Sequence, residues 1–116
     1  MAYDADPASG LPVYDTVKYR GQSGWFQVGG TSAGAPQWAA FIAIVNSGRA
    51  ASGKPALSGP SPVYSAWSPG SANFHDVTSG TNGSCGDVCT AALGYDYVTG
   101  LGTPVAAKLY SALVAQ

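Results

Sequence analysis

The spacing of apolar residues predicts a long helix in the first half of the chain. Four large apolar residues recur at the helical i, i+3, i+4, i+7 spacing, at Trp38, Phe41, Ile42 and Val45. The other faces of this segment carry alanines and Ile44. A helix that is apolar on all sides is buried on all sides. We therefore expect much of its cover to come from polypeptide outside this short chain.

A second helix is predicted at the C-terminus. Thr103 followed by Pro104 is typical of a helix start, with a threonine N-cap and proline at the first helical position. We expect this helix to run to about Val114, with two exposed residues, Lys108 and Ser111. Its buried face is expected to hold three residues: Val105, Leu109 and Leu113.

The remaining elements are predicted to be short. Residues 24–28, 74–77 and 95–98 are candidate strands. Residues 63–67 allow one turn of helix. Because the chain holds 16 glycines and eight prolines, we expect loops and turns to connect these pieces over much of its length.

Composition narrows the class of protein. Hydrophobic residues make up 46% of the 116 positions and charged residues only 9%, which excludes a disordered tail. Five basic residues against six acidic ones leave a net charge of −1, so no basic patch can neutralise a run of phosphates and nucleic acid is not an expected partner. No apolar run reaches the roughly 18 residues of a transmembrane helix, so no membrane partner is expected.

The N-terminal segment carries no visible signal peptide, since residues 1–12 are polar. Residues 3–7 look like the middle of a domain. We interpret Met1 as an artificial start, from cloning or gene prediction, and expect natural sequence upstream of it.

All six acidic residues are aspartates, and glutamate does not occur: Asp4, Asp6, Asp15, Asp76, Asp87 and Asp96. Sparse charge limits the repulsion that builds up as carboxylates protonate, which is compatible with acid tolerance. A chance bias in a short chain explains the same composition.

Cys85 and Cys89 are the only cysteines, and they lie in a loop rich in Gly, Ser and Asn. A disulfide between them would add roughly 2 kcal/mol of stability on the chain-entropy model and would indicate an oxidising compartment. Two free thiols are the alternative. A zinc site is disfavoured because no further Cys or His lies nearby.

One segment has the pattern of a nucleophile site. The predicted strand at 24–28 leads into residues 29–36, which read Gly-Gly-Thr-Ser-Ala-Gly-Ala-Pro, and then into the first helix. A serine at such a turn places its backbone N–H at a helix N-terminus, where it can stabilise an oxyanion. Small neighbours leave room for a substrate backbone beside Ser32. The simpler interpretation is that Ser32 or Thr31 only caps the helix.

Residues 30–34 also fit the G-x-S-x-G nucleophile elbow of α/β-hydrolases, which would make the protein a small serine esterase. That triad runs in the order Ser, acid, His. The only histidine is His75, and no acidic residue lies between Ser32 and His75. The chain order therefore argues against the esterase.

The segment around Ser32 resembles a different family more closely. Gly-Thr-Ser with Pro36 four residues after the serine is similar to the nucleophile region of the subtilisin-like fold, shared by subtilisins and sedolisins. Residues 74–80 read Phe-His-Asp-Val-Thr-Ser-Gly, and residues 94–104 read Gly-Tyr-Asp-Tyr-Val-Thr-Gly-Leu-Gly-Thr-Pro. Both resemble the C-terminal region of sedolisins. Residues 5–7 and 10–13 resemble the stretch that precedes the sedolisin serine.

The resemblance covers nearly the whole chain, so residues 1–116 look like the C-terminal fragment of a sedolisin-type serine-carboxyl peptidase domain. The implied fold class is α/β, the C-terminal portion of a subtilisin-like fold. Its expected parts are a strand, a serine turn, a buried helix, a calcium loop region and a C-terminal helix.

The resemblance implies an endopeptidase that cuts proteins at acidic pH, with Ser32 as nucleophile. In the family a glutamate base, its aspartate partner and an oxyanion aspartate lie upstream, outside this chain. This chain alone is therefore expected to be inactive or nearly so. His75 is a poor substitute base, because the resemblance gives its neighbour Asp76 another role.

The resemblance also implies a calcium ion as cofactor. Asp76 and Asp96 would supply side-chain oxygens, and Val77, Ala92 and Gly94 backbone carbonyls, with water completing the shell. Ala92 departs from the glycine that is common in the family at this position, so the resemblance supports the placement of its carbonyl less strongly. The alternative is that both aspartates simply hold loop turns.

The implied partners are a protein or peptide substrate and the missing N-terminal part of the catalytic domain. The implied location is secreted, or extracellular. We expect this chain alone to expose apolar surface from the first helix and to self-associate. A second hypothesis is a non-catalytic calcium-binding module that folds alone, and the small serine esterase is a third.

Overall fold

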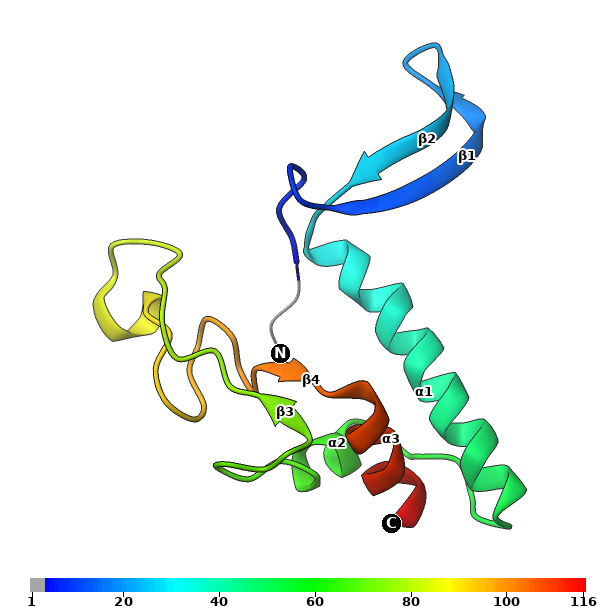
Figure 1. The fold of residues 1–116 in the computed structure, drawn as a ribbon, viewed down its shortest axis with the longest axis vertical. Helices are drawn as coiled ribbons and strands as arrows, with labels where there is room; N and C mark the ends of the chain where they lie inside the picture. Colours follow the sequence, from blue (N-terminus) through cyan, green and yellow to red (C-terminus); the bar gives the residue numbers. More distant parts are fainter. Residues whose placement is uncertain (1–3) are drawn as a thin grey trace. The chain divides into compact units, whose positions relative to one another are not determined.

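The computed structural model describes residues 4–116 and divides them into two units, one ending at Ala39 and one spanning Ala40–Gln116 (Figure 1). The interpretation of Met1 as an artificial start lies outside the described residues. Helices and small antiparallel sheets make up both units, which is compatible with the predicted α/β class.

The first unit is built on a hairpin. Strand β1 (Leu11–Tyr19) pairs antiparallel with β2 (Gln22–Val28). The turn residues Arg20 and Gly21 both have positive φ, 50° and 83°, as a two-residue type I′ hairpin turn requires. The strand predicted at 24–28 is confirmed as part of β2, whereas β1 was not predicted.

After β2 the chain enters a short 3-10 helix, η1 (Thr31–Ala33), and continues as α1 (Gly34–Ala51). The predicted order of strand, serine turn and helix is therefore confirmed. Val45 on α1 is completely buried, whereas Ile44 is 60% exposed. The described residues thus do not cover α1 on all sides.

The second unit holds the core. Strand β3 (Phe74–His75) pairs antiparallel with β4 (Thr103–Pro104), and the two lie side by side (Figure 1). Along the chain, α2 (Ser61–Ser65) precedes β3, and the C-terminal helix α3 (Ala106–Ala115) follows β4. The predicted short helix and the strand at 74–77 are confirmed with shifted ends. The largest buried apolar residues are Val45, Val63, Phe74, Leu101, Leu109 and Leu113.

The predicted start of the last helix is wrong. Thr103 and Pro104 are extended and form β4, and α3 begins at Ala106 without a side-chain cap. The reason is long-range pairing: β4 pairs with β3, and the Val105 N–H donates a hydrogen bond to the Asn73 carbonyl at 2.9 Å. This pairing keeps the chain extended past the local helix signal.

The faces of α3 follow the prediction. Leu109 and Leu113 are fully buried, Val105 is half-buried, and Lys108 and Ser111 are exposed. The strand predicted at 95–98 is wrong, because this segment forms a turn closed by a bridge between Asp96 and Gly100.

Two cationic side chains donate hydrogen bonds to carbonyls at the C-terminal end of α3. The guanidinium of Arg49, only 7% exposed, donates to the carbonyls of Leu113 at 2.7 Å and Pro55 at 2.8 Å. Lys54 Nζ donates to the Val114 carbonyl at 2.9 Å. Carbonyls at a helix C-terminus lack intrahelical partners and carry partial negative charge, so these bonds fasten α3 to the end of α1. Within the described part of the chain, no helix has the length and apolarity needed to span a bilayer.

Candidate active site and metal-binding loops

Ser32 lies in η1, at the point where the hairpin gives way to α1. Gly30 precedes η1 with φ 132° and ψ 151°, a conformation that favours glycine. The turn closes through the Ala33 N–H, which donates to the Gly30 carbonyl at 3.0 Å. The side chain of Ser32 is exposed, and neither it nor Thr31 forms a helix-capping hydrogen bond with residues 4–116. The hydroxyl is therefore open to a reaction partner.

A loop packs closely against the segment that leads to Ser32. A Cβ added at Gly10 would collide with the Val28 carbonyl, and one added at Gly29 with the backbone of Asp6 and Pro7. Only glycine allows such close backbone contact at these two positions. The small residues around the serine thus serve packing as well as access.

The aspartates of this loop are used within the loop itself. Asp4 accepts hydrogen bonds from the Asp6 N–H at 3.1 Å and the Ser9 hydroxyl at 2.9 Å. Asp6 accepts one from the Ala8 N–H at 2.9 Å. The side-chain amide of Gln27 on β2 donates to the Ala8 carbonyl. In the first unit these carboxylates hold a turn, and neither is bonded to Ser32.

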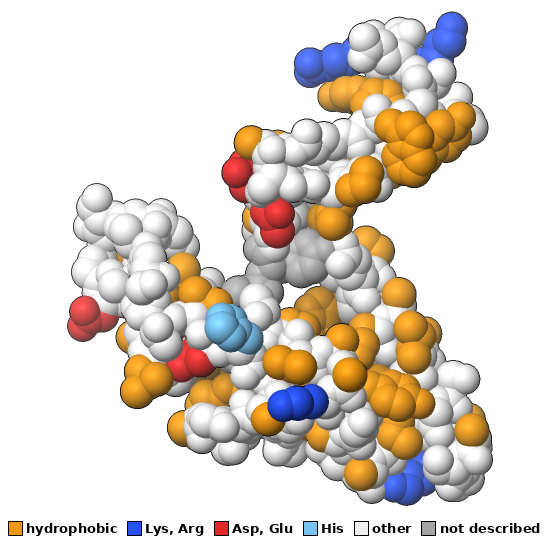
Figure 2. Space-filling view, viewed as in Figure 1, with side chains coloured by type: hydrophobic (Ala, Val, Ile, Leu, Met, Phe, Trp, Pro, Cys, Tyr) orange, Lys and Arg blue, Asp and Glu red, His pale blue; other side chains and the backbone are white. Residues whose placement is uncertain are grey.

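The hairpin before Ser32 exposes much apolar surface. Trp25 is 73% exposed and packs edge-on against Tyr14, with ring centroids 5.3 Å apart. An open hollow of about 280 Å³ lies over Gly10, Pro12 and the three residues Trp25, Phe26 and Gln27. Figure 2 shows hydrophobic side chains gathered on the hairpin. An isolated two-stranded hairpin is marginally stable in water, and an exposed apolar surface of this kind favours an interaction with other polypeptide.

His75 lies on β3 in the second unit, with its side chain exposed. Its backbone is closely approached by Gly102, which has φ +80° and where a Cβ would collide with the His75 carbonyl oxygen. Glycine is therefore required at position 102 on two grounds. The sequence prediction did not single out this residue.

Asp96 is a buried carboxylate, 6% exposed, that organises its own turn. Its Oδ1 accepts the N–H groups of Val98 at 2.9 Å and Thr99 at 2.6 Å. Its Oδ2 accepts the Thr99 hydroxyl at 2.9 Å and the Ala92 N–H at 3.1 Å. The Thr99 N–H contributes most to lowering the pKa of Asp96 below its ordinary value, and the other hydrogen bonds add to this against an opposing effect of burial.

Asp76 follows β3, and its Oδ2 accepts the Gly94 N–H at 2.7 Å. One carboxylate is thus tied to Gly94 and the other to Ala92, so four of the five predicted calcium ligands meet in one group of loops. Val77, the fifth, is the next residue after Asp76. The carbonyls of Val77, Ala92 and Gly94 accept no hydrogen bond from residues 4–116.

These residues fit calcium in the kind and number of their oxygen atoms, since two carboxylates, three carbonyls and one water give six ligands. Among residues 4–116, no cluster of three or more His, Cys, Asp or Glu side chains could hold a metal, so carbonyl oxygens would have to contribute. The four hydrogen bonds of Asp96 use the acceptor capacity of a carboxylate. A metal would have to replace some of them, and in this structure Asp96 holds a loop turn, as the alternative interpretation expects.

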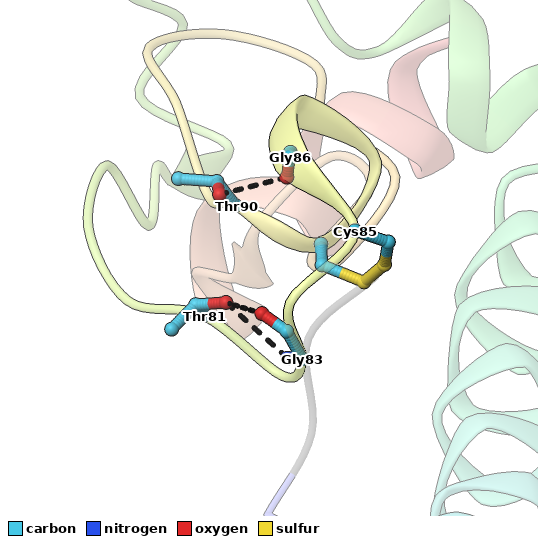
Figure 3. The surroundings of a disulfide bond; sticks show 6 residues. Thr81, Gly83, Cys85, Gly86 and Thr90 are labelled. Atoms are coloured by element: carbon cyan, nitrogen blue, oxygen red, sulfur yellow. Dashed lines mark hydrogen bonds between the residues drawn. A yellow bond between two sulfur atoms is a disulfide. The ribbon is translucent and has the colours of Figure 1, made fainter.

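The loop between Val77 and Ala92 carries the predicted disulfide, Cys85 bonded to Cys89. At its base the Ala91 N–H donates to the Gly80 carbonyl at 2.9 Å. Figure 3 shows two threonines farther out that each donate a hydroxyl hydrogen bond to a glycine carbonyl, Thr81 to Gly83 at 2.6 Å and Thr90 to Gly86 at 2.9 Å. Nearly all of this loop is exposed, and its residues, all of which the structure describes, form no apolar core, so the disulfide is what restrains its conformation.

No protein-family model matches the chain. Among curated proteins, it is 45% identical to physarolisin of Physarum polycephalum over 89 residues, covering 72% of this chain and 16% of that protein. It is 45% identical to tripeptidyl-peptidase sed1 of Aspergillus fumigatus over 78 residues, covering 66% and 12%. It is 36% identical to kumamolisin of a Bacillus species over 116 residues, covering 98% and 19%. The chain therefore spans less than a fifth of the length of these relatives.

Proposed function

Because the chain belongs to the sedolisin family of peptidases, we propose that residues 1–116 form the C-terminal part of a serine-carboxyl endopeptidase domain, with Ser32 as the nucleophile. The observation that carries the proposal is the exposed Ser32 hydroxyl on the turn between β2 and α1. Hydrolases present a nucleophilic serine in this way, with its backbone N–H near a helix N-terminus.

The base that deprotonates Ser32 is a carboxylate from upstream polypeptide. The chain holds no glutamate, and Asp4 and Asp6 already accept hydrogen bonds within their own loop. A carboxylate with an ordinary pKa near 4 works at acidic pH, where a histidine base would be protonated. The serine adds to the substrate carbonyl, and an upstream aspartic acid donates a hydrogen bond to the oxyanion. Without both groups this chain alone is inactive, or slower by several orders of magnitude.

A calcium ion joins the loop after β3 to the turn that contains Asp96. Asp76 and Asp96 supply carboxylate oxygens, and Val77, Ala92 and Gly94 supply carbonyls. Bound calcium would stabilise the state in which both loops are in place. The donor set supports this assignment, because three carbonyls in these loops are free of hydrogen bonds from residues 4–116.

The substrate is a protein or peptide, and the partner that completes the site is the N-terminal part of the same catalytic domain. The protein acts outside the cell. The Cys85–Cys89 disulfide supports this location, because disulfides persist in oxidising compartments.

The test is proteolysis of a denatured protein substrate near pH 4, by a longer natural polypeptide that includes upstream sequence. Ser32→Ala should abolish cleavage, while Ser47→Ala, a matched change of an exposed serine on α1, should leave it intact. Cleavage that survives Ser32→Ala would overturn the proposal. Ester hydrolysis near neutral pH that Ser32→Ala abolishes would support the small esterase instead. A calcium-dependent rise in Tm without any proteolysis would support the non-catalytic module.

A further inference from the structure

A small cavity lies in the second unit beside Asp76. Its volume is about 40 Å³. It lies between the turn after α2, the end of β3 and the loop that carries Gly94, and its lining includes Trp67, Ser71, Phe74, Asp76, Gly94 and Leu101. Phe74 and Leu101 belong to the buried core, so one side of the cavity is apolar and rigidly packed.

Ser71 brings an unexplained polar group to this cavity. Its Oγ is the one buried side-chain oxygen or nitrogen among residues 4–116 that has no hydrogen-bond partner. Its backbone is well placed by contrast, since the Ser71 N–H donates to the Ser68 carbonyl at 2.9 Å. A buried hydroxyl without a partner is unfavourable, and native proteins satisfy such groups with protein or with ordered water.

Asp76 leaves a matching acceptor at the same place. Its Oδ2 is bonded to the Gly94 N–H, while its Oδ1 accepts no hydrogen bond from residues 4–116. A cavity must offer more than about 10–15 Å³ and two to four polar partners to hold one water molecule. The volume meets the first condition, and Ser71 and Asp76, which both line the cavity, are its two candidate polar partners.

We propose that this cavity is a binding site for one ordered water molecule, held between Ser71 Oγ and the carboxylate of Asp76. Ser71 is thereby a positioning residue for Asp76: the water supports the second oxygen of the carboxylate while Gly94 supports the first. Where Asp76 ligates calcium, as in the proposed function, this support also orients the ligand. The water site itself does not depend on calcium.

The test is the sign of a stability change. Ser71→Ala removes only the hydroxyl oxygen. If the hydroxyl binds a water that bridges to Asp76, the Tm measured without calcium falls, by about 4 °C or more. If the hydroxyl is an unsatisfied group, the Tm stays the same or rises. The matched control is Ser65→Ala, an exposed serine at the end of α2 that does not line the cavity. We expect this control to leave the Tm unchanged.

A lower Tm in Ser71→Ala alone supports the water site. No fall, or an equal fall in both variants, overturns it. A crystal structure of the protein then shows the water directly, within hydrogen-bond distance of Ser71 Oγ in the wild type and lost in Ser71→Ala.

Calcium titration separates this inference from the proposed calcium site. If calcium raises the wild-type Tm, the rise should be smaller in Ser71→Ala. If calcium does not change the wild-type Tm, the calcium site fails, while the calcium-free comparison of the two serine variants still decides the water site.

Discussion

The serine turn and the aspartate loops differ in whether residues 4–116 supply hydrogen-bond partners for their functional side chains. Ser32 projects an exposed hydroxyl that has no partner within residues 4–116, on a unit whose strands expose Trp25 and Tyr14. Asp96 is buried and holds four hydrogen bonds from its own loop, in a unit with an apolar core. In the proposed function, the first region needs groups from elsewhere to act, whereas hydrogen bonds within the second region already specify its conformation. The proposed function therefore predicts that proteolysis needs polypeptide outside the chain, whereas the loop structure should form without it.

The largest effect expected on the second region comes from Gly102→Ala. The change combines a positive φ with a collision against the His75 carbonyl, and we expect a loss of about 3 kcal/mol in unfolding free energy. Gly70→Ala is the matched control, with φ +76° and open space around its Cβ, and should cost about 1 kcal/mol. Denaturant unfolding measures both. Equal losses would show that the approach of Gly102 to β3 is not a constraint.

Replacing both cysteines by serine should have the next largest effect. On the chain-entropy model, a ring this small contributes roughly 2 kcal/mol. Because the loop is exposed, the loss should be local, and the amides of Asn82 and Ala91 should exchange hydrogen faster. The amide of Leu113 in α3 serves as the internal control. Faster exchange at Leu113 as well would mean that the loop is not separable from the core.

A smaller effect is expected from acid. Hydrogen bonds lower the pKa of Asp96 below its ordinary value of 3.8. A carboxyl group with a lowered pKa in the folded state stabilises it above the ordinary pKa, and this contribution is lost as the pH falls through the folded value. The Tm should therefore decline below about pH 4, and Asp96→Asn should flatten that decline. Asp87→Asn, at an exposed carboxyl, should leave the decline unchanged. An equally steep decline in Asp96→Asn would remove Asp96 as its cause.

The smallest effect concerns the exposed hairpin. We expect the chain alone to self-associate through apolar surface, and Trp25→Ser should lower the association measured by sedimentation. Tyr97→Ser removes an equally exposed aromatic residue from the second unit and is the control. If the control lowers association as much as Trp25→Ser, the hairpin is not the surface responsible.

Local sequence signals predicted the parts of the fold that depend on local geometry. The apolar spacing predicted α1, the residues on the buried face of α3 were predicted correctly, and the glycine pair before Ser32 indicated the turn. The hairpin strand β1 was missed, although it is rich in β-branched and aromatic residues, with Val13, Val17 and Tyr19 at even spacing on one face, and a glycine follows it at Gly21.

The predictions fail where pairing with residues distant in the chain determines the local structure. Thr103 and Pro104 carry a correct local helix signal, but pairing with β3, almost thirty residues away along the chain, overrides it. The candidate site shows the same division. Asp76 and Asp96 were singled out, whereas the part played by Thr99, with both its N–H and its hydroxyl on Asp96, was not. An aspartate in a turn commonly accepts the backbone N–H two residues on, as Asp96 does from Val98, so that part of the turn was open to prediction.

The most direct test of the central claim compares two polypeptides in one assay. The chain of residues 1–116 and a longer natural polypeptide with upstream sequence are incubated with a denatured protein substrate near pH 4. We predict cleavage by the longer polypeptide and at least 1,000-fold less by the chain alone, since the base proposed for Ser32 lies upstream. Comparable cleavage by the chain alone, abolished by Ser32→Ala, would contradict the claim that the base lies outside it.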